Sequence, residues 1–482
     1  MNENASSGIW ITLTIIFLVS LVDGLDVSIV TVSVPTMAAE FGVSVAQSSW
    51  IIFAYVLGVA ALLLPMGKAA KNHRVKKFLL LGTAAFGVSS VLCGMSFSFE
   101  MMIISRLLQG ASAAMMSSVL PSIVVDMLPV DRKGLGLSIM GAATALSSMM
   151  GPILGGLMSE FLSWSWLFYI NVPISLIIIL LTVRQIPKES PPDRSRDPTA
   201  LGGVSALVVV LSLLILLEDL GDEDANRLAR IICPLAGIIG SVALVWSIRR
   251  DADRAIIAPK MIMNKEYLLV GAAFLLCTIV VSGAQYILPY VLQQNWALTP
   301  AESGLYLAVP SVSMLLLVLP VGGFCDRHGC KLPSAMAAIV RGAFCAVMLF
   351  MTYSTGEPIL LLIPLLVFGA SHAFSGTAQP TRMMHHATPG YQDEATNFML
   401  VINYVASALG CVLFAMIVGM FTNGPIETIT GEELLSGFRA TMVFSLALLA
   451  GALMFTLSVR NKIVRNDEVI ENVGTSKTRE RT

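Results

Sequence analysis

Three ionisable side chains interrupt long apolar stretches of the sequence, and their types could move protons. Asp23 and Asp26 lie in the first apolar run and Arg106 lies in the fourth. An ionisable group inside a membrane span costs about 2.5–3.5 kcal/mol on insertion scales, so each of the three requires an explanation. Asp23 and Asp26 are three residues apart and would share one face of a helix.

Two interpretations of these residues remain open on the sequence alone. The functional one is a carboxylate that exchanges protons, with Asp26 as the first candidate, Asp23 as the second, and Arg106 at a depth similar to that of Asp26. The alternative is a buried ion pair that only fixes packing. Burial favours the neutral acid and a nearby arginine favours the carboxylate, so the sequence does not decide the balance.

The composition places these residues in a lipid bilayer. Hydrophobic residues make up 56% of the 482 residues and charged residues 13%, whereas about 25% of the residues of a soluble domain are charged. Mean hydropathy is +0.80. Because a spanning helix needs about 20 mostly apolar residues, we predict an all-α polytopic membrane protein with about fourteen transmembrane helices. The predicted spans are 8–30, 48–66, 78–95, 101–125, 135–158, 165–184, 199–217, 229–247, 267–291, 302–322, 333–352, 357–380, 396–420 and 438–459.

The basic residues between these spans predict the orientation of the chain. Lys and Arg collect in alternate connecting segments and in the C-terminal tail: 67–77, 184–196, 249–265, 326–331 and from 460 onward. The segments 31–47, 96–100, 293–301 and 421–437 contain neither. Since cytoplasmic loops collect Lys and Arg, we expect a multi-pass protein of the plasma membrane with both termini cytoplasmic. A net charge of −1 gives no whole-chain attraction to nucleic acid.

A repeated phrase divides the chain into two halves. "PMGKAAKNHRVKK" (65–77) and "PVGGFCDRHGCK" (320–331) align at a constant offset that sets Gly67 on Gly322 and Lys76 on Lys331. Each copy follows the second span of a six-span unit, and internal repeats of this kind are typical of secondary transporters with a substrate site between the halves. We predict an N-terminal six-helix half at 1–186, linkers with an inserted helix pair at 187–265, a C-terminal six-helix half at 266–460 and a cytoplasmic tail at 461–482.

Other residues are candidates for packing or for a substrate cavity. "GPILGG" holds Gly151, Gly155 and Gly156, which would let the fifth span pack closely, and Pro152, which would let it bend. Static packing is the alternative for this motif. The candidates for a cavity that binds flat ligands are Trp50, Tyr55, Gln285, Tyr286 and His372. Aromatic side chains also gather at membrane interfaces, and a lone histidine is often a packing residue.

Two further side-chain groups are expected to carry no chemistry. We expect Arg341 to extend its charged end to the cytoplasmic edge of the eleventh span. Cys325, His328 and Cys330 lie in one short loop without a second cluster, which is too few ligands for a zinc site, so we expect no metal.

Four motifs together resemble the major facilitator superfamily, in particular its fourteen-helix drug:proton antiporter branch. "LDVSIVTVSVP" (25–35) is similar to the first-helix motif and places Asp26 on its acidic position, and "RLLQGASAA" is similar to the fourth-helix motif, with Arg106 first. "GPILGG" resembles the antiporter motif, and "SWSWLFYINVP" resembles the sixth-helix entry. The resemblance implies a major facilitator fold and a part for Arg106 in proton coupling.

The repeated phrase resembles the cytoplasmic loop motif of the same family. Gly322, Asp326, Arg327, Gly329 and Lys331 match that motif, whereas the first copy keeps only Gly67 and Lys76. The resemblance implies that each copy is part of a cytoplasmic gate.

The first copy of this motif departs from the family pattern. Lys71 stands at the acidic position and Asn72 at the basic one. We expect Lys71 to meet the acid of Asp126 or of Asp131 instead, in a first gate that has been rebuilt or weakened.

These observations predict a proton-coupled secondary transporter that exports amphipathic small molecules by alternating access. The proton gradient would supply the energy, with no cofactor, and the partners would be small-molecule substrates, protons and the lipid bilayer, for a chain that acts as a monomer. An exporter of one metabolite, such as a siderophore or an amino acid, is the first alternative, and a membrane sensor that does not transport is the second. We expect no enzyme, because the sequence holds no phosphate loop and no nucleophile with a placed base.

Overall fold

The computed structural model describes residues 3–70, 75–129, 132–186, 205, 208–209, 212, 229–250, 263–351, 358–388, 392–422 and 430–461. Every regular element within these residues is helical. The helices are α1 (Glu3–Phe41), α2 (Val45–Ser48), α3 (Trp50–Ala70), α4 (Val75–Gly94), α5 (Phe99–Ser117), α6 (Leu120–Met127), α7 (Lys133–Phe161), α8 (Trp166–Tyr169), α9 (Asn171–Gln185), α11 (Ala229–Arg250), α13 (Lys265–Tyr290), α14 (Pro300–His328), α15 (Lys331–Met351), α16 (Leu362–His386), α17 (Gln392–Gly419) and α18 (Gly431–Ser458), with a π-helical turn at Val291–Asn295 and a 3-10 turn at Pro358–Leu361.

Twelve helical segments of the described chain are long and apolar enough to cross a membrane. They correspond to the first six and the last six predicted spans. The eighth predicted span, 229–247, coincides with α11, and the seventh, 199–217, lies almost wholly outside the described residues. The total of fourteen therefore stays a prediction, as do the four predicted domain boundaries.

The first span is longer than the sequence analysis predicted. Helix α1 continues to Phe41, so much of the segment 31–47 is helical rather than a loop. Val34, Met37 and Ala38 in this extension are fully buried. The free energy gained by this burial offsets the loss of the backbone hydrogen bond that Pro35 removes inside the helix.

Local capping determines where several helices begin. Ser98, Asn264, Thr299 and Thr430 precede α5, α13, α14 and α18, and each side chain accepts a hydrogen bond from a backbone N–H of the first turn. Such caps satisfy N–H groups that have no carbonyl partner within the helix. The apolar runs that follow these residues therefore start their helices at defined points.

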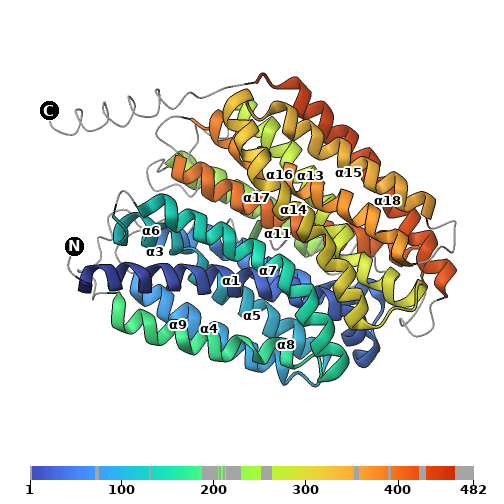
Figure 1. The fold of residues 1–482 in the computed structure, drawn as a ribbon, viewed down its shortest axis with the longest axis horizontal. Helices are drawn as coiled ribbons and strands as arrows, with labels where there is room; N and C mark the ends of the chain where they lie inside the picture. The colour runs from blue at the N-terminus through green and yellow to red at the C-terminus, as the bar shows by residue number, and fades with distance from the viewer. Residues whose placement is uncertain are drawn as a thin grey trace.

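The two sets of six long helices repeat one packing pattern. In the N-terminal half, α1 packs on α7, α3 on α5, and α4 on both α5 and α9. In the C-terminal half the equivalent pairs are α13 with α17, α14 with α16, and α15 with α16 and α18. Figure 1 shows the halves as two layers, blue to green below and yellow to red above. The packing thus reproduces the duplication that the repeated phrase indicated.

The halves meet through two equivalent helix pairs, α7 with α14 and α3 with α17. Helix α1 begins and α18 ends at the same end of the bundle, on the left in Figure 1. We call this the terminal end and the opposite one the distal end. The two described ends of the chain therefore lie at the same end of the bundle.

Hydrogen bonds join the halves at the distal end. The Ser48 hydroxyl lies 2.9 Å from the Tyr286 hydroxyl and 2.5 Å from that of Tyr290, and Tyr286 also donates to the carbonyl of Val45. Gln293 Nε2 donates to the Val32 carbonyl at 3.0 Å. These contacts close the distal end in this conformation.

Glycines allow α7 and α14 to touch at this end. A Cβ added to Gly156 would lie 3.0 Å from the Cα of Ala301, and one added to Gly304 would overlap the Pro152 carbonyl. Backbones can approach this closely only where a side chain is absent.

Replacing Gly156 by valine should therefore open the distal end. Overpacking costs about 1–3 kcal/mol, which corresponds to about a 5- to 150-fold shift between two conformations. The buried Ser303, changed to cysteine in a cysteine-free protein, should react faster by about this factor with an impermeant maleimide.

Gly141→Val is the matched control, since Gly141 is on the same helix and a Cβ there would meet nothing within 4 Å. Equal labelling of the two valine variants would show that the glycine contact does not hold the distal end closed.

Candidate functional site

A fully buried cluster surrounds Asp26 inside the N-terminal half. Arg106 Nη1 donates to Asp26 Oδ2 at 2.5 Å. Gln109 Nε2 and Asn171 Nδ2 donate to Asp26 Oδ1 at 2.7 and 2.8 Å. All four side chains are at most 1% exposed, so both carboxylate oxygens are occupied and shielded from solvent.

Four helices position this cluster. Asp26 comes from α1, Arg106 and Gln109 from α5, and Asn171 from the first residue of α9, while Ser90 of α4 accepts a hydrogen bond from Gln109 at 2.9 Å. The Arg106 guanidinium lies 4.5 Å from the centre of the Tyr55 ring, and its Nε donates to the Ile51 carbonyl at 2.8 Å. The sequence predicted that Asp26 and Arg106 lie at a similar depth, and the structure brings them into contact.

Asp23 lies in a different environment one turn earlier on α1. Tyr55 and Ser117 donate their hydroxyl protons to Asp23 Oδ1 and Oδ2 at 2.9 and 3.0 Å. Tyr404 of α17 donates to Oδ2 at 3.3 Å and so links the two halves. Unlike Asp26, Asp23 is only half-buried and lines a cavity.

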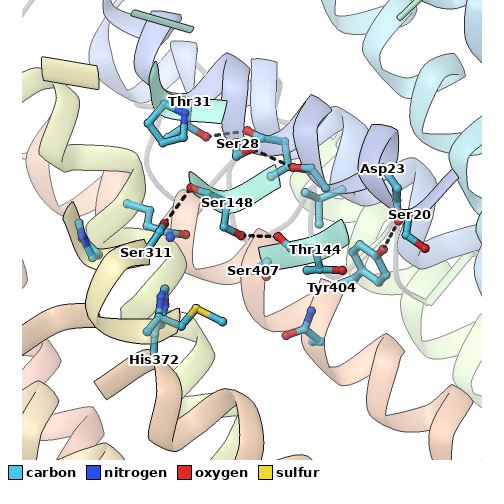
Figure 2. Close-up of a pocket in the computed structure, with 18 of the residues that line it drawn as sticks. Ser20, Asp23, Ser28, Thr31, Thr144, Ser148, Ser311, His372, Tyr404 and Ser407 are labelled. Carbon is cyan, nitrogen blue, oxygen red and sulfur yellow. Dashed lines mark hydrogen bonds between the residues drawn. The ribbon is translucent and has the colours of Figure 1, made fainter. Parts of the chain in front are cut away.

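The cavity lies between the halves and has a volume of about 450 Å³, within the usual range of about 300–1,000 Å³ for ligand pockets. Figure 2 shows Asp23 and Tyr404 at one side and His372 at another, with the hydroxyls of Thr144 and Ser148 between them. The lining extends from Thr31, Pro152 and Leu307 toward Leu63, Leu120 and Leu400, on the terminal side.

Two of the five predicted cavity residues line this cavity, namely Gln285 and His372. Trp50, Tyr55 and Tyr286 lie outside its described lining. Trp50 packs edge-on against Phe53 with ring centroids 4.7 Å apart, and Tyr55 and Tyr286 are fully buried. Tyr55 nevertheless reaches the site through its hydroxyl on Asp23.

The "GPILGG" residues act at two contacts of α7. A Cβ at Gly151 would overlap the Ser28 hydroxyl of α1, and one at Gly155 would overlap the Ile29 carbonyl. Pro152 lines the cavity, and Gly156 faces α14 as described above. The motif thus holds α7 close to α1 and to the other half.

The lysine found in both copies of the repeated phrase makes the same kind of contact in each half. Lys76 Nζ donates to the carbonyls of Val183 and Ile186 at 3.0 and 2.5 Å, at the end of α9. Lys331 Nζ donates to the Leu457 carbonyl at 2.9 Å, at the end of α18. A cation at a helix C-terminus binds carbonyls that lack an intrahelical partner. This lysine therefore links the third long helix of each half to the sixth long helix of the same half.

The remaining gate residues are only partly described. Gly67 lies in α3 and Gly322 lies in α14. A Cβ added to Gly67 would lie 3.8 Å from the side chain of Ser118, and one added to Gly322 would lie 3.7 Å from the side chain of Thr377. Gly329 ends α14 with φ of +83°, a conformation that glycine adopts without strain. The Arg327 side chain is exposed.

Lys71 and Asp131 lie outside the described residues, and the side chains of Asp126 and Asp326 are not among those described. The rebuilt gate therefore stays a prediction.

The C-terminal half holds its own buried arginine. Arg341 is 0% exposed, so the prediction that it extends to the membrane edge was wrong. Its guanidinium donates to the Ser375 hydroxyl at 2.8 Å, to the Ser371 hydroxyl at 3.1 Å and to the Cys277 carbonyl at 3.1 Å. These acceptors on α16 and α13 replace the hydration that the charge would otherwise need.

Sequence reasoning missed Tyr404 and Ser117 as partners of Asp23. Both are hydroxyl residues inside apolar helices, which is a weak signal. Tyr404 is 381 residues from Asp23 in the chain, and only the packing of the two halves brings it there.

Comparison with known proteins assigns the family. The family model described as Major Facilitator Superfamily matches residues 16–411. The chain belongs to the major facilitator superfamily. It is therefore a membrane transporter rather than an enzyme.

Similar superfamily members in the curated set include transporters of different named substrates. The riboflavin transporter RibZ of Clostridioides difficile is 26% identical over 416 residues, which cover 84% of this chain and 87% of the relative. The multidrug export protein EmrB of Haemophilus influenzae is 29% identical over 345 residues, covering 70% and 66%. Multidrug resistance protein 3 of Bacillus subtilis is 24% identical over 425 residues, covering 86% and 80%.

Solved structures of transporters show the same fold. A bacterial homolog of the human lysosomal transporter Spinster, in its inward-facing unoccupied conformation, aligns with a TM-score of 0.63 at 15% identity and covers 95% of this chain and 97% of that one. A peptide transporter POT in complex with sulfate aligns with a TM-score of 0.68 at 14% identity, covering 93% and 94%.

Proposed function

We propose that this superfamily member is a proton-coupled antiporter that exports amphipathic small molecules by alternating access. The observation that carries the proposal is Asp23, a carboxylate on the wall of a cavity between two repeated halves. Its hydrogen bond with Tyr404 joins the two halves, so the protonation of this carboxylate can be linked to the relative position of the halves. The multidrug relatives support the same function.

The geometry favours Asp23 over Asp26 as the group that exchanges protons. A proton must reach the group from an aqueous cavity, and Asp23 lines one. Asp26 is 0% exposed and has donors on both oxygens. In this proposal the Asp26–Arg106 cluster lies behind Asp23 and holds α1 against α5.

The contacts at the distal end support an arrangement that is open toward the terminal end. The hydrogen bonds Ser48–Tyr286, Gln293–Val32, Ala301–Glu160 and Ser311–Ser148 join the halves on the distal side of Asp23–Tyr404. With the termini on the cytoplasmic side, this conformation would take up substrate from the cytoplasm.

Transport of one metabolite is the second candidate. It is favoured by the riboflavin transporter, whose alignment covers more of its own length than the EmrB alignment does. The cavity is large enough for a flavin, because about 450 Å³ is within the range for such ligands.

Dye movement in inverted membrane vesicles with an acid interior tests the proposal. Vesicles containing the protein should accumulate ethidium, and an uncoupler should abolish the accumulation. Riboflavin in place of ethidium tests the second candidate. Accumulation that an uncoupler does not affect would exclude proton coupling, and the absence of movement of either compound would contradict both candidates.

A further inference from the structure

Most of the hydroxyl side chains in the described lining of the cavity already use their protons, whereas the Ser20 hydroxyl has no hydrogen-bond partner. A hydroxyl has one proton to donate and two lone pairs that accept. In helices, serine and threonine commonly donate this proton to a carbonyl four residues earlier. The donations in the cavity wall are Ser28 to Gly24 at 2.9 Å, Thr31 to Val27 at 2.8 Å, Thr144 to Met140 at 3.0 Å, Ser148 to Thr144 at 3.0 Å and Ser311 to Ser148 at 2.9 Å.

Two further hydroxyls on the wall donate to Asp23. Ser117 and Tyr404 both donate to Oδ2, so their protons are also occupied. The carboxylate itself can only accept when it is ionised. The described lining contains no Lys or Arg, the side chains that would offer several fixed donors.

The wall formed by α1 and α7 is therefore rich in acceptors. Thr144 and Ser148 are exposed or half-buried at the cavity, and Figure 2 shows them beside Ser28 and Ser311. The facing wall from the C-terminal half is different, because it combines apolar side chains with groups that can donate. The apolar side chains are Leu288, Met314 and Phe368, and the polar groups are the amides of Gln285 and Asn403, the imidazole of His372 and the hydroxyl of Ser407.

We propose that this cavity selects amphipathic ligands by their hydrogen-bond donors, taking protonated primary amines and polyhydroxylated ring compounds in preference to compounds of equal charge that lack N–H and O–H groups. The donors of the ligand would face α1 and α7, and its rings would face Phe368 and Leu288. The inference rests on the proposed function only in taking this cavity as the substrate site.

The physical basis is the free-energy cost of removing water from hydrogen-bond acceptors without supplying a new donor. A ligand without donors removes water from these oxygens and returns no hydrogen bond, and a buried polar group left unpaired is costly. A site built to pair a donor therefore rejects an analogue that lacks it more strongly than an apolar pocket would.

Two matched pairs of fluorescent ligands test the inference on the purified full chain. Dansylcadaverine and its terminal trimethylammonium analogue carry the same charge, but only the first has N–H donors on its cationic end. Riboflavin and lumiflavin share a ring system, but only the first carries the hydroxylated chain. In each pair the donor-bearing compound should bind at least about tenfold more tightly, as expected for one or more hydrogen bonds. Equal or reversed affinities in either pair would overturn the inference.

Substitutions of Thr144 on α7 test the contribution of the wall hydroxyls to ligand preference separately from that of Asp23. Thr144→Val removes the acceptor at nearly constant shape and should lower the preference within the amine pair by about threefold or more, whereas Thr144→Ser keeps the acceptor and should keep the preference. Thr31→Val makes the same test on α1 if Thr144→Val does not fold. An unchanged preference in a folded valine variant would also overturn the inference.

Binding and export can fail separately. If the donor preference holds but no compound is transported in vesicles, the proposed export is wrong and the chemistry of the cavity stands. If export holds while the preference is absent, only the present inference is wrong.

Discussion

Replacing Asp23 by asparagine will uncouple export from the proton gradient while leaving the cavity able to bind substrate. Asparagine has nearly the same shape. Its single carbonyl oxygen can still accept from Tyr55 and its amide N–H can donate to the Ser117 hydroxyl, but it cannot take up a proton. A driving force of about 100 mV contributes about 2.3 kcal/mol per proton moved, and its loss lowers the accumulated substrate by about fiftyfold. Ethidium accumulation in energised inverted vesicles measures this effect.

Exchange of labelled for unlabelled substrate across unenergised vesicles provides the control. It requires binding and alternating access but no proton, so the Asp23→Asn protein should retain it. Wild-type accumulation by Asp23→Asn would refute the role assigned to Asp23. If Asp26→Asn alone abolished accumulation while retaining exchange, the proton would have to be assigned to Asp26, as the sequence first suggested.

Replacing Arg106 by leucine will destabilise the protein more than any of the other changes considered. It leaves the carboxylate of Asp26 fully buried with only Gln109 and Asn171 as donors. Removing one partner of a buried ion pair costs about 3–5 kcal/mol. We expect a large fall in the melting temperature of the purified chain, measured by the loss of monodisperse protein after heating.

A double-mutant cycle identifies the cause of this destabilisation. Adding Asp26→Asn to Arg106→Leu removes the unpaired charge and should restore part of the lost stability, with a coupling energy of about 1–3 kcal/mol. Arg327→Leu is the matched control, since that side chain is exposed, and it should change stability by less than about 0.5 kcal/mol. A double variant as unstable as the sum of the single ones would mean that the ion pair does not hold α1 to α5.

The duplicated lysines show how far a repeat in the sequence can be interpreted. The constant offset of Lys76 and Lys331 predicted equivalent places in two halves, and both lysines indeed bind the end of the sixth long helix of their half. The sequence could not predict these partners, because backbone carbonyls carry no residue-type signal. They become acceptors only where a helix ends beside the lysine.

The contacts that close the distal end and join the halves were harder to predict from the sequence than the repeat itself. Tyr286 was predicted as a cavity residue, yet it closes the distal end by bonding with Ser48 and Val45. An aromatic residue with a hydroxyl suits either position equally well. Only the approach of α13 to the segment around α2 distinguishes the two.

Composition and the spacing of apolar runs determined by themselves that this chain is a helical membrane protein built as two repeated halves, because backbone groups in lipid must be paired within helices. They also marked Asp23, Asp26 and Arg106, since charges in such runs are costly. Tertiary structure alone decided which aspartate meets the cavity. At 3.6 residues per turn the two side chains are about 60° apart around α1, so Asp26 turns into the contact with α5 and α9 while Asp23 turns toward α17 and the space between the halves.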